Sequence, residues 1–184
     1  MKQDYILATG EEKNEDKDNE NESRIKDKEN YLNSDNKEID IKVLNNHIYF
    51  YTGVSKKSAL ELNIKLREVQ QKILNKYNDH TFHQEYIYLH INSFGGSVFA
   101  AFSIIDTIKN LKIPVISIIE GAAASAATLI SVVCEYRIIY KTSYMLIHQL
   151  SSGTWGKMDE LEDEMDNLKE LMNCIKNIYK THTK

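Results

Sequence analysis

The sequence predicts an α/β fold in which helices connect the strands of a largely parallel sheet. Short apolar segments typical of strands alternate with longer segments whose apolar residues recur at helical spacing. This alternation favours parallel pairing through right-handed crossovers. At 184 residues the chain has the length of one domain with a buried core.

The first half of the folded region contains two strand–helix units. Residues 47–51 predict a buried strand that ends in a turn at Thr52-Gly53. Ser58 and Glu61 form a plausible capping box for a helix whose apolar stripe continues to Tyr77. Residues 86–91 predict the second strand, which the turn 92–96 closes before a helix that ends near residue 110.

The second half begins with a strand at residues 115–119, entered through Pro114, the only proline. A helix of small residues is expected from about Ala124 to Cys134, followed by strands at 137–140 and 144–147. A long charged helix is expected over 157–179. We expect its apolar stripe to face inward, with Leu161, Met165, Leu168, Met172, Ile175 and Tyr179.

Negative charge is concentrated at the start of the chain. Residues 1–40 carry 13 acidic and 7 basic side chains, a net of −6, whereas the other 14 acidic and 16 basic side chains give +2. Residues 11–40 are almost without apolar side chains, so we expect 1–40 to be an acidic disordered leader and 41–184 the folded domain. The near-neutral remainder argues against a nucleic-acid groove, which needs clustered Lys and Arg.

Compartment and redox state follow from what the sequence lacks. It has no apolar run of about 20 residues, so no membrane span is expected. The leader resembles neither a secretory signal nor a transit peptide. The two cysteines, Cys134 and Cys174, are expected to be reduced packing residues rather than a disulfide framework or metal site. We therefore expect a cytoplasmic protein without a bound metal.

Ser125 and His148 are the strongest candidates for chemistry. Ser125 lies in the small-residue run 121–127 near an expected helix start, where the local potential favours a developing oxyanion. His148 ends the apolar run 145–147, 23 residues further on. A serine hydroxyl is a poor nucleophile unless a base within hydrogen-bond reach accepts its proton. Taken singly, the run also fits close helix packing and the histidine a structural role.

A third stretch, Asn92 to Ser97, contains adjacent glycines directly after a predicted strand. Glycines there let the backbone turn sharply and expose N–H groups without a Cβ atom in the way. Alone, the stretch equally fits a simple strand-to-helix turn. All three stretches follow strand ends, where binding groups collect in α/β sheets.

In this order and with these flanks, the three stretches resemble the proteolytic subunit of the caseinolytic Clp protease (ClpP, the S14 serine peptidases). The resemblance runs from about Ile41 to Lys184 and is densest in 88–98, 105–108, 121–127 and 145–149. It implies the ClpP/crotonase-like fold of repeated strand–strand–helix units, with a long helix protruding after the histidine. It also implies an ATP-dependent Clp protease proteolytic subunit, a serine endopeptidase acting on unfolded polypeptides.

The resemblance implies a role for each matching site residue. Ser125 would be the nucleophile that forms the acyl intermediate, and His148 the general base. The backbone N–H groups of Gly96 and Ala126 would form the oxyanion hole. Extended segments after Gly96 and after His148 would clamp a peptide as an added β-strand. The substrate-binding residues would be Gly95, Ser97, Val98, Gln149 and Leu150.

Partners are implied by the same resemblance. Subunits of this family form heptameric rings that stack, with the helix 157–179 at the ring–ring contact. An AAA+ unfoldase ATPase delivers unfolded polypeptides and is the component that uses ATP, so no cofactor is expected in this chain. Homomeric rings and rings mixed with a paralogue both fit the pattern.

The chain also departs from the family pattern. The family's triad aspartate lies farther along than Lys184, so the domain is expected to be incomplete at its C-terminal end relative to the family. Asp159, Asp163 and Asp166 fit surface charges better than substitutes for that acid. Phe94 and Leu150 replace turn prolines, and His90 replaces a second tyrosine near Tyr88 in the ATPase docking pocket.

These departures leave two alternatives open. One is a non-catalytic ring subunit that shapes an assembly with an active partner. The other is a crotonase-type acyl-CoA enzyme, which shares the wider fold and a backbone oxyanion hole. The carboxylates and the basic patch that such an enzyme needs are not evident in the sequence.

Overall fold

One six-stranded sheet organises the chain. The computed structural model describes residues 41–76, 85–153 and 155–183, so the predicted leader, residues 1–40, lies outside the described residues. The strands β1 (Lys42–Leu44), β2 (His47–Phe50), β3 (Ile87–Ser93), β4 (Val115–Ala124) and β5 (Tyr136–Ile139) lie side by side in sequence order. β6 (Tyr144–Leu146) also pairs with β4. All pairs from β2 to β6 are parallel, as predicted.

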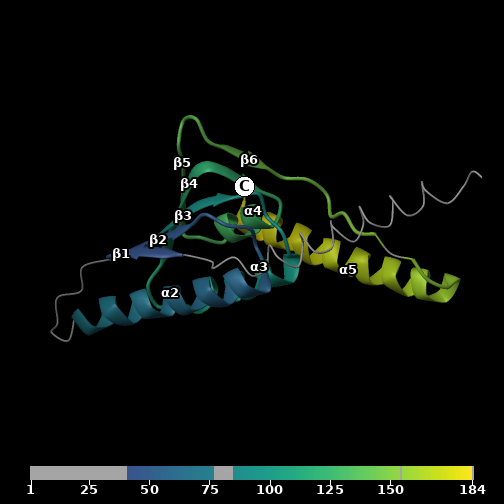
Figure 1. The fold of residues 1–184 in the computed structure, drawn as a ribbon, viewed down its shortest axis with the longest axis horizontal. Coiled ribbons are helices and arrows are strands. Elements are labelled where there is room, and N and C mark those ends of the chain that lie inside the picture. The colour runs from purple at the N-terminus through teal and green to yellow at the C-terminus, as the bar shows by residue number, and fades with distance from the viewer. Residues whose placement is uncertain (1–40, 77–84, 154, 184) are drawn as a thin grey trace, which may run out of the picture. The chain divides into compact units, whose positions relative to one another are not determined.

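The helices lie together on one side of this sheet (Figure 1). They are α2 (Lys56–Lys76), α3 (Val98–Asn110), α4 (Ala126–Val132) and α5 (Met158–His182). Each parallel strand from β2 to β5 is added next to the previous one, and right-handed crossovers in one direction put every connecting helix on the same face. The core therefore forms between this face and the helices, and β3 contributes Ile87, Leu89 and Ile91 to it, all fully buried.

β1 was missed by the sequence analysis. It pairs with β2 in an antiparallel hairpin in which Leu44 lies opposite His47, so only Asn45 and Asn46 form the loop. Asn45 has φ 56°, and a two-residue loop that follows the twist of the strands needs positive φ, which asparagine tolerates better than most residues. The Asn-Asn pair was the available signal.

The start of α2 corrects the predicted capping box. The helix begins at Lys56, and the reciprocal hydrogen bonds join Ser55 and Ser58. The Ser58 N–H donates to Ser55 Oγ at 3.1 Å, and the Ser55 N–H donates to Ser58 Oγ at 2.9 Å. Glu61 instead accepts a hydrogen bond from the Ile41 backbone N–H, which fastens the start of the described chain to α2.

β4 is longer than predicted, and this places the candidate nucleophile. The strand continues through Ala124, because Ala122–Ala124 pair with Tyr144–Leu146 of β6. The following helix, α4, was expected from about Ala124 and begins at Ala126. Ser125 is thus the single residue between strand and helix.

The apolar stripe of α5 was expected to face the core, and this is confirmed for Ile175 and Tyr179 but not for the other residues of the stripe. None of its residues is buried, and Met165 is 54% exposed. Only its last two turns approach the core, through Ile175, Ile178 and Tyr179. Cys174 is exposed, contrary to the expected packing role, whereas Cys134 is buried; both are free thiols.

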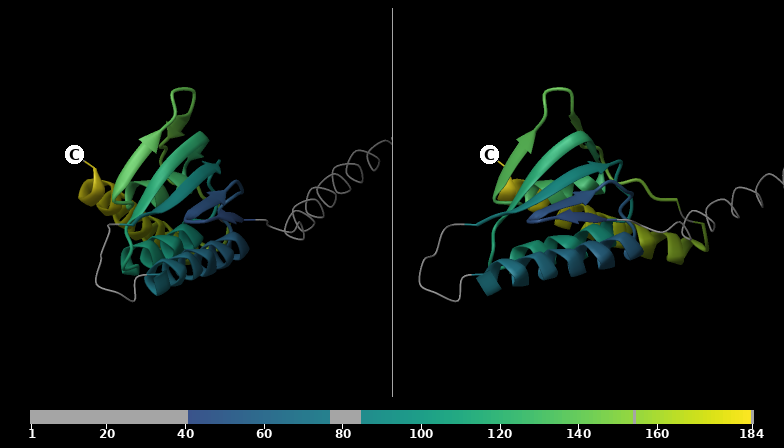
Figure 2. Two further views of the ribbon diagram at one scale, coloured as in Figure 1. Left: turned by 90° about the vertical axis from the view of Figure 1, so that its left-hand side faces the viewer. Right: turned by 60° about the vertical axis from the view of Figure 1, so that its left-hand side comes forward.

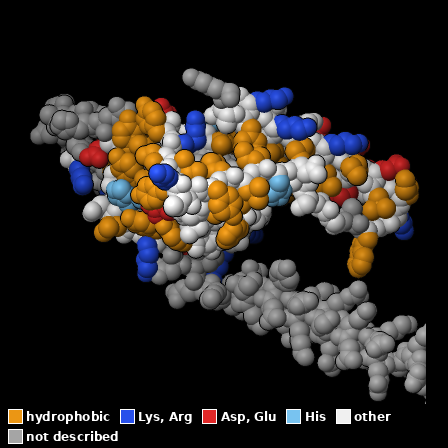
Figure 3. Space-filling view, turned by 90° about the horizontal axis from the view of Figure 1, so that it is seen from above, with side chains coloured by type: hydrophobic (Ala, Val, Ile, Leu, Met, Phe, Trp, Pro, Cys, Tyr) orange, Lys and Arg blue, Asp and Glu red, His pale blue; other side chains and the backbone are white. Residues whose placement is uncertain are grey.

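Within the described residues, no helix covers the opposite face of the sheet (Figure 2). Hydrophobic side chains gather on this face (Figure 3). Around β5 and β6, Tyr136, Ile138, Tyr140, Tyr144 and Leu146 are each between 45% and 53% exposed. Exposed apolar surface of this kind is typical of sites that contact a protein, a membrane or a ligand. Among the described residues, no helix is both long and apolar enough to cross a membrane.

Candidate active site

Ser125 and His148 lie at the same edge of the sheet because their strands are parallel neighbours. Ser125 follows the last residue of β4, and His148 comes two residues after the end of β6. The Ser125 N–H donates to the Leu146 carbonyl oxygen at 2.8 Å, which extends the ladder to the serine. Both residues line one cavity of about 740 Å³.

The backbone of Ser125 is held in a conformation that few residues adopt. Its φ is 53° and its ψ is −125°, a positive φ of the kind that clusters at functional sites. Such a sharp strand-to-helix turn keeps a serine hydroxyl off the helix and accessible to a substrate. The Ser125 side chain makes no capping hydrogen bond to α4, so Oγ is available to react.

A glycine turn after β3 lies against the serine. Gly95 has φ 92° and Gly96 has φ 142°, values that side-chain-bearing residues rarely adopt. The Val54 N–H donates to the Gly95 carbonyl, and the Ser97 N–H donates to the Val54 carbonyl, both at 2.8 Å. In this parallel bridge the intervening Gly96 N–H faces away from Val54. It is therefore available to bind an oxygen atom.

Ala126 supplies the second candidate amide. It is the first residue of α4, and the first N–H groups of a helix have no partner within the helix. An atom at the Cβ position of Gly95 would lie 3.0 Å from the Ala126 nitrogen, so the glycine turn and this amide are neighbours. Two donors beside a nucleophile are the arrangement that stabilises an oxyanion.

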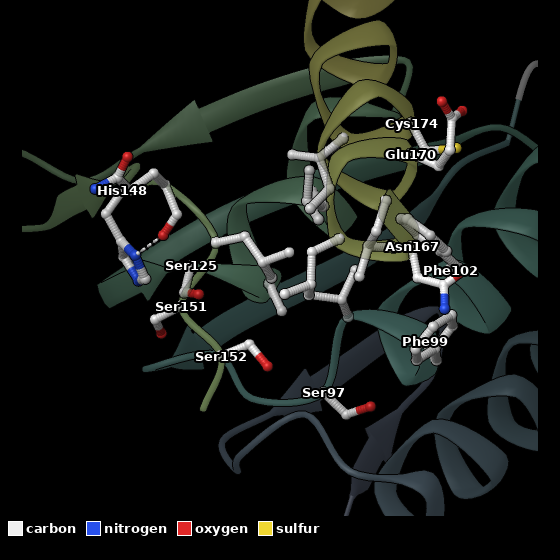
Figure 4. A pocket seen from close by; sticks show the side chains of 18 of the residues that line it. Ser97, Phe99, Phe102, Ser125, His148, Ser151, Ser152, Asn167, Glu170 and Cys174 are labelled. Carbon is white, nitrogen blue, oxygen red and sulfur yellow. Dashed lines mark hydrogen bonds between the residues drawn. The ribbon is translucent and has the colours of Figure 1, made fainter. Parts of the chain in front are cut away.

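His148 is exposed, and its Nδ1 lies 2.7 Å from the carbonyl oxygen of Gln149 (Figure 4). A carbonyl oxygen can only accept a hydrogen bond, so Nδ1 carries the proton and Nε2 keeps the lone pair of a base. Across the described residues, no hydrogen bond joins Ser125 and His148. A hydrogen bond between the two side chains therefore requires one or both of them to move.

The cavity collects most of the residues that the sequence singled out. Gly96, Ser97, Val98, Ser125, Ala126, His148, Gln149 and Leu150 all line it, whereas Gly95 does not line it and lies against Ser125 instead. Three turns that are distant in the sequence thus meet at one place.

The sequence analysis missed the apolar wall of this cavity. Side chains of α3, α4 and α5 form it, including Phe99, Phe102, Leu129, Leu168, Leu171 and Ile175. Phe99 is 72% exposed, and its ring meets Phe102 edge-on with centroids 6.3 Å apart. Phe102 also packs against the core, so its helical spacing alone gave it no special role. Only the placement of α5 beside α3 would have identified it as part of the cavity wall.

A separate polar cluster lies on the helix-free face of the sheet. His47 Nδ1 lies 2.8 Å from His90 Nε2, and His90 Nδ1 lies 2.7 Å from Glu120 Oε1. The Tyr51 hydroxyl donates to the other oxygen of Glu120. His90 also stacks against Tyr49 with ring centroids 4.4 Å apart. The cluster joins β2, β3 and β4 but does not reach the cavity around Ser125.

The pKa values of this cluster follow from burial and from its hydrogen bonds. Burial alone would raise the pKa of the Glu120 carboxyl, but hydrogen bonds with Tyr51 and His90 outweigh it and lower that pKa. Burial, with His90 nearby, lowers the pKa of His47. Hydrogen bonding to Glu120 raises the pKa of Tyr51 to about 12.

Together, the sheet and the cavity resemble the site of a serine hydrolase. A serine on a strained turn, an imidazole on the same cavity and two neighbouring amides are the parts that acyl transfer requires. Comparison with known proteins is more specific. The family profile described as Clp protease matches residues 36–184, and the chain belongs to the Clp protease family.

Individual relatives agree with this membership. An ATP-dependent Clp protease proteolytic subunit of Cyanophora paradoxa is 32% identical over 160 residues, covering 84% of this chain and 78% of the relative. The corresponding subunit of Deinococcus radiodurans is 31% identical over 102 residues, covering 54% of this chain and 50% of the relative. Among solved structures, a ClpP1 mutant from Listeria monocytogenes superposes with a TM-score of 0.64 at 23% identity, over 76% of this chain and 72% of that one. The structural similarity confirms the predicted fold class.

Proposed function

We propose that this chain is a serine endopeptidase subunit of the Clp type that cleaves unfolded polypeptides through an acyl-Ser125 intermediate. Family membership supports a serine peptidase. One observation carries the assignment to these residues: the strained Ser125 shares its cavity with a histidine whose Nε2 is left as the base.

The proposed reaction uses the groups around this cavity in two stages. His148 Nε2 accepts the Ser125 hydroxyl proton as Oγ attacks the scissile carbonyl carbon, and the amides of Gly96 and Ala126 bind the resulting oxyanion. His148 then returns the proton to the leaving amine, and the peptide bond breaks. Water, activated by the same imidazole, hydrolyses the ester and restores Ser125.

Substrate binding in this proposal relies mainly on the peptide backbone. The extended Ser97 on one side of the cavity and Gln149 and Leu150 on the other would pair with the substrate as an added strand. Val98 was expected in the same extended segment, but it begins α3 and would contact the substrate only through its side chain. Main-chain pairing reads little sequence, which suits a subunit that degrades many unfolded polypeptides.

Active-site labelling tests the assignment. A fluorophosphonate probe should form a covalent adduct on the peptide that contains Ser125, and Ser125→Ala and His148→Ala should each abolish labelling. His182→Ala is the matched control, since His182 lies at the end of α5 outside the residues lining the cavity. An assembled, full-length protein that stays unlabelled would refute the proposal.

The quaternary structure is part of the same proposal. Members of this family form rings that associate with unfoldase ATPases. We propose stacked heptameric rings, homomeric or mixed with a paralogue, that work with an AAA+ unfoldase. The exposed apolar strands β5 and β6 and the exposed stripe of α5 support such contacts. We further propose a cytoplasmic location, supported by the two free thiols.

A non-catalytic ring subunit is the second candidate, and one observation favours it. His148 is hydrogen-bonded to the Gln149 carbonyl and, within the part of the chain that the structure describes, neither to a carboxylate nor to Ser125. Loss of the orienting carboxylate in a serine triad costs about 10⁴ in kcat. A homomeric ring without peptidase activity that becomes part of an active complex with a paralogue would favour this candidate.

A further inference from the structure

Two consecutive hydrogen bonds connect the end of α5 to the backbone of Ser125. The Thr128 hydroxyl donates to the Ser125 carbonyl oxygen, with Oγ1 and O 2.6 Å apart. The hydroxyl of Tyr179, 51 residues further along the chain, lies 2.5 Å from the same Thr128 Oγ1. Thr128 is fully buried, and Tyr179 is one of the few α5 residues that pack against the core.

The direction of this chain of hydrogen bonds follows from the proton count. A threonine hydroxyl has one proton, and that of Thr128 is used on the Ser125 carbonyl. The Tyr179 hydroxyl must then donate to Thr128 Oγ1. Burial raises the pKa of Tyr179, so its phenol keeps the proton that this role requires.

Without Tyr179, the Thr128 side chain could adopt either of two rotamers. In the first turns of a helix, threonine divides between two rotamers, because one of them lets Oγ1 bond to a carbonyl three or four residues earlier. A donor at the position of Tyr179 favours the rotamer that faces Ser125. The Ser125 carbonyl then receives two hydrogen bonds, from Thr128 Oγ1 and from the Thr128 N–H at 3.0 Å.

We propose that Tyr179 and Thr128 are positioning residues for the nucleophile. Tyr179 fixes the Thr128 hydroxyl, and that hydroxyl holds the Ser125 carbonyl and with it the strained backbone that presents Oγ. The inference rests on the proposed function, because it concerns the reactivity of Ser125. The proposed chain of hydrogen bonds needs both residues, and it begins on α5, a helix that is not part of the sheet.

The test compares variants that remove one hydroxyl each in the full-length, assembled protein. Tyr179→Phe keeps the ring and removes the donor, whereas Thr128→Val keeps the shape and removes both bonds. Thr128→Ser keeps the hydroxyl and is the conservative rescue. Tyr49→Phe is the matched control, since Tyr49 lies on β2 outside the residues lining the cavity and the variant keeps the ring that stacks on His90. The measurements are the rate of fluorophosphonate labelling, kcat and KM for a peptide, and the melting temperature.

We expect Tyr179→Phe to lower the labelling rate and kcat by about three- to tenfold, the scale of one hydrogen bond, with KM unchanged within about twofold. Thr128→Val should lower them at least as much, and the double variant should match Thr128→Val alone. Thr128→Ser and Tyr49→Phe should stay near the wild-type rates. If Thr128→Val does not fold, the drop caused by Tyr179→Phe must still appear in the Thr128→Ser background.

Two results would overturn the inference while leaving the proposed function intact. One is wild-type labelling and kcat in Tyr179→Phe. The other is a double variant in which the two effects multiply, because independent effects exclude a chain of hydrogen bonds. A wild-type protein whose Ser125 is not labelled would overturn the inference and the proposed function together.

Discussion

An atom at the Cβ position of Gly95 would lie 2.8 Å from the Cβ atom of Ser125 and 2.6 Å from the Ala124 carbonyl oxygen. The turn that follows β3 and the turn that follows β4 are therefore in direct backbone contact. This contact places the Ala126 amide beside the glycine turn that carries Gly96. The geometry of the site thus depends on residue 95 having no side chain.

Gly95→Ala is expected to damage both stability and reactivity. Positive φ at residue 95 and the contact with Ser125 should together lower the free energy of unfolding by about 1–3 kcal/mol. Labelling of Ser125 should fall at least tenfold as the two turns move apart. Urea denaturation and probe labelling measure these effects. Gly53→Ala is the control, since its Cβ would meet the Gly95 oxygen at an ordinary 3.6 Å; equal behaviour of the two variants would contradict the argument.

Two leucines on opposite sides of α2 test the position of the core. Leu66 is fully buried against the sheet, whereas Leu60 is 63% exposed. Leu66→Ala should lower the free energy of unfolding by about 2–5 kcal/mol, because it removes buried apolar surface and leaves a cavity. Leu60→Ala should change it by less than about 0.5 kcal/mol. Chemical denaturation of both variants measures the two changes in the free energy of unfolding. A larger loss for Leu60→Ala than for Leu66→Ala would mean that the opposite face of α2 packs against the sheet.

The two cysteines should differ in reactivity toward a thiol reagent. Cys134 is 2% exposed, and burial raises the pKa of its thiol to about 12, so it has almost no thiolate at neutral pH. Cys174 is exposed. One thiol should react in the native protein and two in denaturant, as measured with a chromogenic disulfide. Cys174→Ser should abolish the native reaction; a native reaction in that variant would show that Cys134 is accessible.

Stability should decrease on acidification because of the His47–His90–Glu120 cluster. The pKa values of His47 and Glu120 are both lower in the folded protein than their usual values of 6.5 and 4.5. The unfolded chain therefore binds more protons as the pH falls, and the free energy of unfolding declines. The decline should begin near pH 6.5 with His47 and continue below pH 4.5 with Glu120.

Glu120→Gln isolates the carboxyl's share of this pH dependence. The variant should lose stability less steeply below about pH 4.5 than the wild type, as followed by thermal melts across the pH range. Its melting temperature near pH 7 should be the lower of the two, because the charged partner of Tyr51 and His90 is gone. If the variant loses stability below about pH 4.5 as steeply as the wild type, Glu120 contributes little to the pH dependence of stability.

The sequence was sufficient to predict the parallel arrangement and most helices, since long apolar patterns determine them. It was less informative where the structure of a segment depends on the strand that pairs with it. Residues 121–124 are Gly-Ala-Ala-Ala, without the branched side chains of typical strands, so the strand was expected to end at residue 119 and a helix to begin near Ala124. They form a strand because β6 pairs with them. The same pairing brings His148 to the cavity.

The site was predictable as a set of turns but not as a cavity. Ser125, His148 and the glycines each follow a strand end, and parallel strands bring such ends together. Tyr179 and Thr128 carried no local signal, because their contact spans 51 residues. The apolar stripe of α5 could not reveal its exposure, since a pattern of side chains does not show which surface covers them.

The loop between β5 and β6 is a place where the fold should tolerate inserted residues. Both strands pair with β4, β5 with Ile116–Ile119 and β6 with Ala122–Ala124, and the chain between them projects away from the sheet (Figure 2). The Gly121 N–H donates to Ser143 Oγ at 2.7 Å and fastens the returning chain before β6 begins. Extra residues spliced in at Lys141 and Thr142 would therefore lengthen the projection without displacing His148, which makes this loop a suitable place for an affinity tag or a reporter.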